Sequence, residues 1–133
     1  MVGSRFLLPL IVLSFALGRA ESPPAGDVAN ARAAVEANLK DKAGQDYAKA
    51  ALAAFAKSHA KTLKACQDSV TAPDTSRFEA FFMLSRRGMV KTSLLSPATK
   101  VGECLLRGSD KDAFPPPPGP NHWILIRSSD IRG

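Results

Sequence analysis

The feature that most constrains the fold is a change in the spacing of apolar residues near the middle of the chain. From residue 52 to residue 70, six mostly apolar residues recur every three or four positions, which is the period of one helix face; we call this set the stripe. They are Leu52, Phe55, His59, Leu63, Cys66 and Val70. From Phe78 to Leu84 the period falls to two, which is typical of a strand. A chain of 133 residues with both periods is expected to form one domain that combines helices with a sheet.

Two helices are predicted before the change in period. Asp27 can cap an alanine-rich helix that Gly44 ends, and Asp46 can cap the longer helix, which runs to about Asp68. The first helix has one narrow apolar stripe, Val28, Val35 and Leu39. Because that stripe is weak, we expect the first helix to be peripheral.

A hairpin is predicted after the turn-rich segment 70–76. Its first strand is Phe78–Leu84 and its second is Met89–Leu95, with residues 85–88 as the loop. Gly88 suits the loop position that needs a positive φ. In the second strand Val90, Thr92 and Leu94 are expected on one face.

A short helix and a last strand complete the predicted elements. Ser96 is the expected N-cap, Pro97 the first helical residue, and Gly108 the residue that ends the helix. The apolar face of this helix is Val101, Cys104 and Leu105. The last strand is Trp123–Ser128.

The order of these elements predicts an α+β domain with a three-stranded antiparallel sheet of order 2-1-3. The short helix returns the chain so that the third strand runs antiparallel to the first, and the two can pair without a buried crossover. Residues 78–84 then lie in the centre of the sheet, and the helices are expected to pack on one of its faces.

The first 20 residues have the pattern of an export signal. Phe6–Gly18 is an apolar run of 13 residues, about 20 Å of helix, which is too short for a bilayer core of about 30 Å. Small residues at Gly18 and Ala20 predict cleavage after Ala20; an uncleaved anchor or a core helix is the alternative. We therefore divide the chain into a signal peptide (1–20), a leader with the peripheral helix (21–44) and the α+β domain (45–133).

The charge pattern excludes few partners. Loss of the first 20 residues lowers the net charge from +6 to +4, and the charges are scattered. There is no nucleic-acid-binding signature. Arg86 and Arg87 at the predicted hairpin tip are either a solvated turn or a contact for phosphate or carboxylate groups of an envelope polymer.

Cys66 and Cys104 are the only two cysteines. In an exported protein an even pair predicts one disulfide, and both residues lie on the apolar faces of their helices. The spacing matches neither a thioredoxin-like centre nor a haem attachment, and two cysteines do not make a zinc site. We expect no cofactor and no metal.

No catalytic group is predicted. His59 and Cys66 resemble a base and a nucleophile, but seven residues along a helix separate them by about 10 Å. His122, at the start of the last strand, has no predicted partner. We therefore expect a protein that is not an enzyme.

The run Phe114–Pro118 has two interpretations. It can be a polyproline ligand for a proline-reading domain, or Phe114 can pack under the sheet while the prolines guide the chain into the last strand. The second interpretation is favoured.

The order of several motifs resembles the C-terminal domain of the energy-transducing TonB superfamily, over residues 52–131. The motifs are Cys66, Gly88-Met89-Val90, Ser96-Pro97, Cys104 and Phe114-Pro115-Pro116-Pro117. The pattern is most similar to small periplasmic relatives with a cysteine pair. The resemblance implies a periplasmic domain that captures a partner's strand on a sheet edge, or a relative that has lost that role. A transducer has a full membrane anchor and a long proline-rich spacer; this sequence shows neither pattern, so we do not expect a transducer.

The third strand is the expected binding edge. In a 2-1-3 sheet it leaves one row of backbone groups unpaired, and a partner strand from an envelope protein or peptide can add there. The predicted contact residues are Trp123, Ile124, Leu125, Ile126 and Arg127. Trp123 can instead be core, and the C-terminus, the first helix or a second copy can instead cover the edge. We expect a periplasmic or secreted adaptor; a small inhibitor or immunity-type protein is the alternative.

Overall fold

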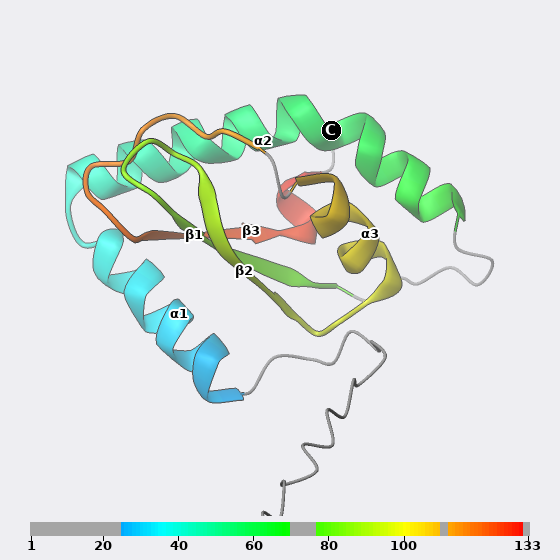
Figure 1. Cartoon of the computed structure of the whole chain (residues 1–133), viewed down its shortest axis with the longest axis horizontal. Coiled ribbons are helices and arrows are strands. Elements are labelled where there is room, and N and C mark those ends of the chain that lie inside the picture. The colour runs from blue at the N-terminus through cyan, green and yellow to red at the C-terminus, as the bar shows by residue number, and fades with distance from the viewer. Residues whose placement is uncertain (1–24, 70–76, 110–111, 132–133) are drawn as a thin grey trace, which may run out of the picture.

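The computed structural model describes residues 25–69, 77–109 and 112–131 (Figure 1). The predicted signal peptide, Val70 and the turn 70–76 lie outside these ranges. The elements are α1 (Ala25–Asn38), α2 (Lys42–Ser69), β1 (Glu79–Leu84), β2 (Val90–Ser96), α3 (Lys100–Ser109), β3 (His122–Arg127) and the 3-10 helix η1 (Ser128–Asp130).

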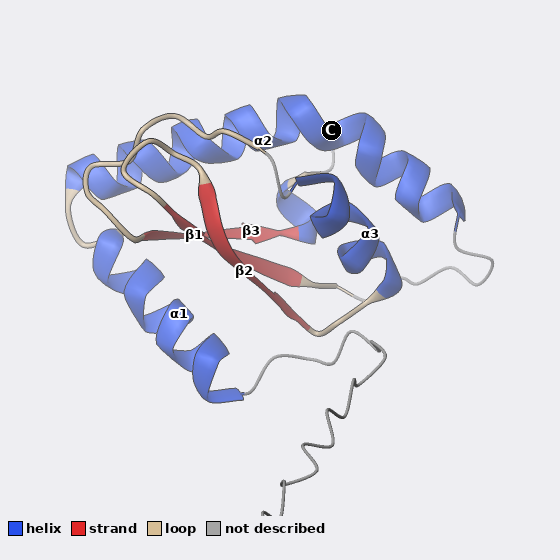
Figure 2. Ribbon diagram, viewed as in Figure 1, coloured by secondary structure: helices blue, strands red, loops and turns tan. Residues whose placement is uncertain are grey.

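The sheet has the order β2-β1-β3, and both neighbours of β1 are antiparallel to it (Figure 2). The predicted α+β class and strand order are confirmed. The side chains of Phe81 and Phe82 point to opposite faces of β1, and both are almost fully buried. A strand that is apolar on both faces is stable only in the centre of a covered sheet.

A bulge changes the expected pattern of β2. Met83 pairs with Thr92 but Leu84 pairs with Val90, which leaves Lys91 as the extra residue. Because an extra residue reverses the side-chain alternation, Val90 packs with the main core while Leu94 packs on the other face. The prediction that Val90, Thr92 and Leu94 share one face is therefore wrong.

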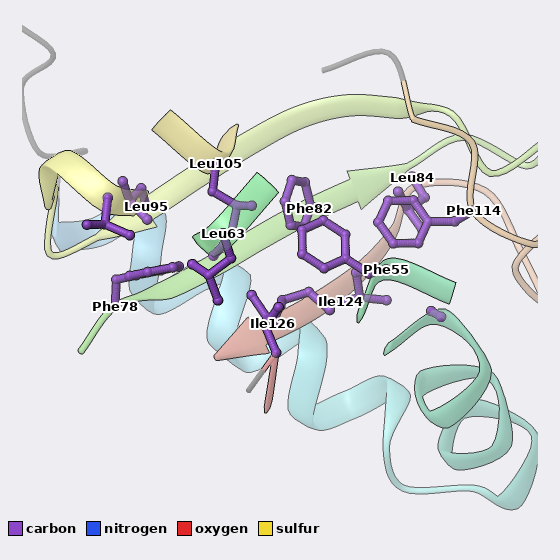
Figure 3. Packing of buried hydrophobic residues seen from close by; sticks show 14 of the residues in the cluster. Phe55, Leu63, Phe78, Phe82, Leu84, Leu95, Leu105, Phe114, Ile124 and Ile126 are labelled. Carbon is purple, nitrogen blue, oxygen red and sulfur yellow. The ribbon is translucent and has the colours of Figure 1, made fainter. Parts of the chain in front are cut away.

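The main core lies between the sheet and helices α2 and α3 (Figure 3). The rings of Phe55, Phe82 and Phe114 form its centre, with centroids 5.7–5.9 Å apart. The stripe predicted on α2 is buried at Phe55, His59, Leu63 and Cys66. The predicted packing of Phe114 under the sheet is confirmed.

Helix α1 covers the opposite face of the sheet. Its buried residues Ala31 and Val35 pack with Phe81, and Trp123 and Leu125 lie against the same cluster. The expectation that the helices share one face holds for α2 and α3 and is wrong for α1. The physical reason is that the second face carries large apolar side chains, which even a weakly apolar helix stabilises by covering.

The turn between α1 and α2 lies at residues 39–41, earlier than predicted. Asp41 caps α2, because its Oδ1 accepts a hydrogen bond of 2.8 Å from the Gly44 N–H. Gly44 therefore lies in the first turn of α2, and the predicted break at Gly44 and cap at Asp46 are wrong. A Cβ at Gly44 would lie 1.6 Å from the Asn38 carbonyl oxygen, so the two helices meet there at backbone contact.

Helix α3 also begins later than predicted. Ser96 still pairs with Glu79 at the end of β2, so it is not available as a cap. Thr99 caps the helix in its place, with its Oγ1 accepting a hydrogen bond of 3.0 Å from the Gly102 N–H. At the other end the helix continues through Gly108, which was expected to end it, to Ser109.

The proline run connects the hairpin tip to α2. Gly88 has a φ of 85°, as predicted, and its carbonyl accepts a hydrogen bond of 2.9 Å from the Phe114 N–H. The Tyr47 hydroxyl donates to the Pro115 carbonyl at 2.7 Å. These contacts support the interpretation of the prolines as part of the architecture.

A disulfide joins Cys66 of α2 to Cys104 of α3, as predicted. Such a bond is typical of an oxidising, extracytoplasmic compartment. It links two helices of the main core and does not include α1.

Removal of the disulfide is expected to destabilise the domain strongly. The bond closes a loop of 38 residues, for which chain entropy gives about 4 kcal/mol. The double variant Cys66→Ser/Cys104→Ser should lower the free energy of unfolding in urea by roughly 2–4 kcal/mol, and reduction of the wild type should have the same effect. Equal urea midpoints for the oxidised and variant proteins would contradict this.

Candidate functional site at the outer edge of β3

The backbone of β3 alternates between groups that face β1 and groups that face outward. The Ser128 N–H donates to the Phe78 carbonyl at 3.0 Å, so the pair at this position faces inward. In an antiparallel ladder the direction alternates with each residue. The N–H and C=O groups of Trp123, Leu125 and Arg127 therefore point away from the sheet.

Two of these three residues have an outward group that the chain itself satisfies. The Asn38 Nδ2 donates to the Trp123 carbonyl at 3.2 Å, and the Arg127 N–H donates to Asp130 Oδ2 at 3.0 Å. Within the described part of the chain, nothing bonds the outward N–H and C=O of Leu125. The unpaired edge predicted for the third strand is therefore shorter than expected. It is centred on Leu125, because the Trp123 carbonyl and the Arg127 N–H on either side are already bonded.

A cavity of about 310 Å³ lies along this edge; we call it the β3 groove. One wall is α1 and the other is the first half of α2, and all of β3 lines it. Its apolar wall residues are Val35 and Leu39 on the α1 side and Ala48 and Leu52 on α2. Since α1 and α2 lie on opposite faces of the sheet, the outer edge of β3 forms the floor of the groove between them.

The groove is closed at the end where β3 begins. There the turn after α1 passes around the sheet edge, with Asn38 bonded to Trp123 and the Tyr47 ring edge-on to the His122 ring at 5.0 Å. The first turn of α2 touches the end of α1 at Gly44. An extended chain in the groove must therefore stop near Trp123.

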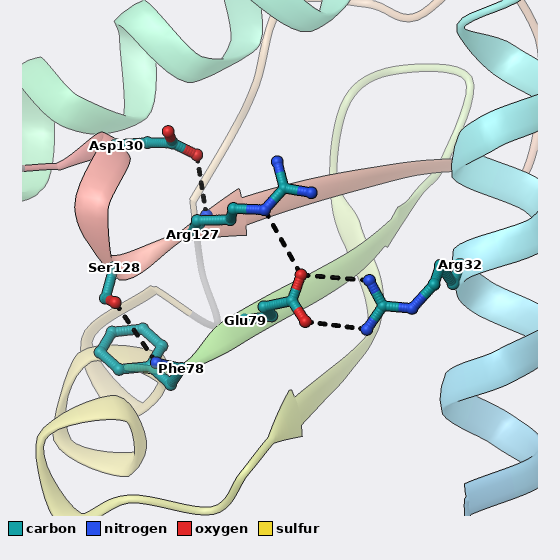
Figure 4. A network of polar contacts seen from close by, with 6 residues as sticks. All are labelled: Arg32, Phe78, Glu79, Arg127, Ser128 and Asp130. Atoms are coloured by element: carbon teal, nitrogen blue, oxygen red, sulfur yellow. Dashed lines mark hydrogen bonds and ion pairs between the residues drawn. The ribbon is translucent and has the colours of Figure 1, made fainter. Parts of the chain in front are cut away.

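Charged groups line the other end of the groove (Figure 4). The Glu79 carboxylate accepts two hydrogen bonds from the Arg32 guanidinium, at 2.8 and 3.1 Å, and lies 3.5 Å from the Arg127 Nε. The hydrogen bonds from Arg32 lower the pKa of Glu79, and burial opposes part of that shift. The guanidinium of Arg32 also lies 5.2 Å from the centre of the Phe81 ring. This ion pair holds α1 against the sheet.

The structure separates the five predicted contact residues into two sets. Trp123, Leu125 and Arg127 have outward backbone groups, whereas the side chains of Ile124 and Ile126 are buried in the main core. The alternative that the first helix or the C-terminus covers this edge is correct in part, because Asn38 at the end of α1 bonds Trp123 and Asp130 bonds Arg127. The individual groove residues on α1 and α2 were not predicted. Trp123 is half-buried in the cluster under α1, so it is both core and groove wall.

The other candidate residues lie elsewhere. Arg86 and Arg87 are exposed at the hairpin tip and do not line the β3 groove. The buried His59 contacts the Asp112 carboxylate through Nε2, a partner that sequence spacing could not reveal. Its Nδ1 is buried, and no residue in the described ranges hydrogen-bonds to it.

The surroundings of His59 do not form a nucleophilic site. Cys66 is in the disulfide, and no hydroxyl bonds His59 among the residues that the structure describes. Ser58 lines the same small cavity of about 40 Å³, but it directly precedes His59 on the helix, so its side chain points in another direction. The His59–Asp112 pair thus connects α2 to the segment before the proline run.

Over residues 25–69, 77–109 and 112–131, no three His, Cys, Asp or Glu side chains group as a metal site. In those ranges no helix has both the length and the apolar character needed to cross a bilayer.

Comparison with protein-family models, with curated proteins and with solved structures finds no match for this chain. The resemblance to the TonB C-terminal domain therefore stays a prediction from the motifs.

Burial of His122 predicts a loss of stability in mild acid. Burial lowers the pKa of His122 below the ordinary 6.5, and the nearby Asp41 carboxylate opposes part of this. The unfolded chain then binds a proton more readily than the folded one, so stability falls as the pH drops below about 6.5 toward the folded pKa. The free energy of unfolding, measured from about pH 7.5 to about pH 5.5, should fall less in His122→Gln than in wild type.

The matched control is His59→Gln, which leaves His122 and its surroundings in place. This variant should keep the contribution of His122 to the pH dependence. A wild-type slope in His122→Gln would show that burial of this imidazole does not control the loss.

Proposed function

We propose that the protein is an exported, non-enzymatic binding module that takes an extended segment of a partner along the outer edge of β3. The observation that carries this proposal is the unpaired N–H and C=O of Leu125, which face the β3 groove. A buried or half-buried backbone pair without a partner is a site where a strand can add, because main-chain bonds then satisfy both groups.

The proposed compartment is the periplasm or the extracellular space. The disulfide between the two core helices supports an oxidising compartment, and the export pattern of residues 1–20 supports secretion. The motif order supports a relationship to small periplasmic TonB-C-like domains. The partner is then an envelope protein or peptide that presents an extended segment.

Site-specific crosslinking tests the proposal. Leu39 and Met89 are two large apolar side chains of similar exposure, 40% and 45%. Leu39 lines the β3 groove, whereas Met89 follows the hairpin tip. A photoreactive phenylalanine analogue at position 39 should capture an envelope protein in cells, and the same analogue at position 89 should not.

The reverse result would contradict the proposal. Capture at Met89 but not at Leu39 would point to a surface contact through the hairpin tip, as expected for an inhibitor or for binding through Arg86 and Arg87. Leu125→Pro removes the outward N–H without a loss in the ladder to β1, and should abolish capture at position 39. Leu125→Ala, which keeps that N–H, is its control.

Export itself has a separate test. Cleavage after Ala20 should give a mature chain that begins at Glu21, and the intact mass of protein from the periplasmic or secreted fraction measures this. A membrane-bound form that retains Met1 would contradict it.

A further inference from the structure

We infer that the β3 groove is built for a single extended segment with uncharged, apolar side chains on both of its faces, and that it excludes the sheet of a second copy. The inference rests on the proposed function and specifies its partner. It follows from the position of the two walls, from the caps on the edge and from the charges of the groove.

The two walls determine the side chains. In an added strand, successive side chains point to opposite faces of the sheet. The residue opposite Leu125 therefore faces α1, where Val35 and Leu39 lie. Its two neighbours face α2, where Ala48 and Leu52 lie. A strand covered on both faces is apolar at consecutive positions, unlike the alternating strand of a half-exposed sheet.

The caps determine the length. The Asn38 amide donates to the Trp123 carbonyl, and the Asp130 carboxylate accepts from the Arg127 N–H. The backbone groups left for a partner strand are therefore centred on Leu125. From Trp123 to Arg127 the strand rises about 13 Å at about 3.3 Å per residue. The core of the bound segment is therefore about three to five residues long.

The charges of the groove favour an uncharged segment. Glu79 binds both Arg32 and Arg127, and Asp130 is used as a cap. With Glu36 on α1 and Lys49 on α2, the groove and its charged end hold three cations and three carboxylates. The groove thus has no excess of charge of either sign, so a charged side chain beside Leu125 would lose hydration with no net opposite charge to offset that loss.

The walls also decide between a free segment and a second copy. If the β3 strands of two copies paired edge to edge, the two strands would lie about 4.8 Å apart. The turn at residues 39–41 passes around this edge, and α1 and α2 flank it, so the helices of two copies would occupy the same space. A lone segment needs no such room.

Two capped peptides test the inference, each with two lysines at one end only for solubility, so that the other end can stop near Trp123. The first has the centre Val-Val-Ala-Val-Val, and the second has Val-Ser-Ala-Ser-Val, which is apolar on one face only. Trp123 is the only tryptophan and lines the groove, so its fluorescence reports binding. The first peptide should bind at least about tenfold more tightly, because two apolar contacts are lost in the second.

Matched variants locate the binding. Ala48→Leu fills the α2 wall and should weaken the first peptide at least about fivefold, by steric exclusion. Ala53→Leu places the same side chain on an exposed position of the same helix outside the groove and should leave affinity unchanged. Exchange of the Leu125 amide should slow on binding in wild type.

Several results would overturn the inference. These are equal affinity for the two peptides, no binding of either, or a concentration-dependent dimer in light scattering with a protected Leu125 amide. The crosslinking experiment at Leu39 does not use these peptides, so its result is independent of them. Failure of this inference is therefore distinguishable from failure of the proposed function.

Discussion

The burial of β1 on both faces is the constraint on which the rest of the structure depends. Phe81 and Phe82 are adjacent, so their rings need cover on opposite sides of a sheet of only three strands. Helices α2 and α3 cover Phe82, and α1 covers Phe81. Since α1 and α2 are consecutive, the chain between them must pass around an edge of the sheet, and it passes around β3. The groove is a consequence of that path.

The sequence was informative where a pattern was local. The period of α2, the alternation at Phe78–Leu84 and the positive φ at Gly88 each depend on residues that are near in the chain, and each is confirmed. The strand order followed because the short α3 leaves few ways to return to the sheet. The disulfide was predicted from the oxidising compartment that the export pattern of residues 1–20 implies.

The errors arose where distant contacts outweigh local preference. Pairing of Ser96 with β1 made Thr99 the cap of α3, and the bulge at Lys91 moved Val90 to the other face. Helix α1 was expected to be peripheral because its own stripe is weak. The position of α1 depends on the apolar sheet face that carries Phe81, and the sequence of α1 itself contains no information about that face. The sequence predicted β3 as the edge and named the first helix as one alternative cover of it, but it did not predict the individual residues of either groove wall.

The disulfide described above has a consequence for how the molecule opens. It closes a covalent loop from α2 through the hairpin to α3, and α1 lies outside that loop. The contacts of α1 include the buried side chains of Ala31 and Val35, the partly buried Val28, the Arg32–Glu79 pair and the Asn38 amide. Most of α2 and all of β3 also lie outside the loop, but the main core holds them against it, whereas α1 packs only in the second cluster. Helix α1 can therefore detach as a separate unit of local unfolding, with the groove wall that belongs to it.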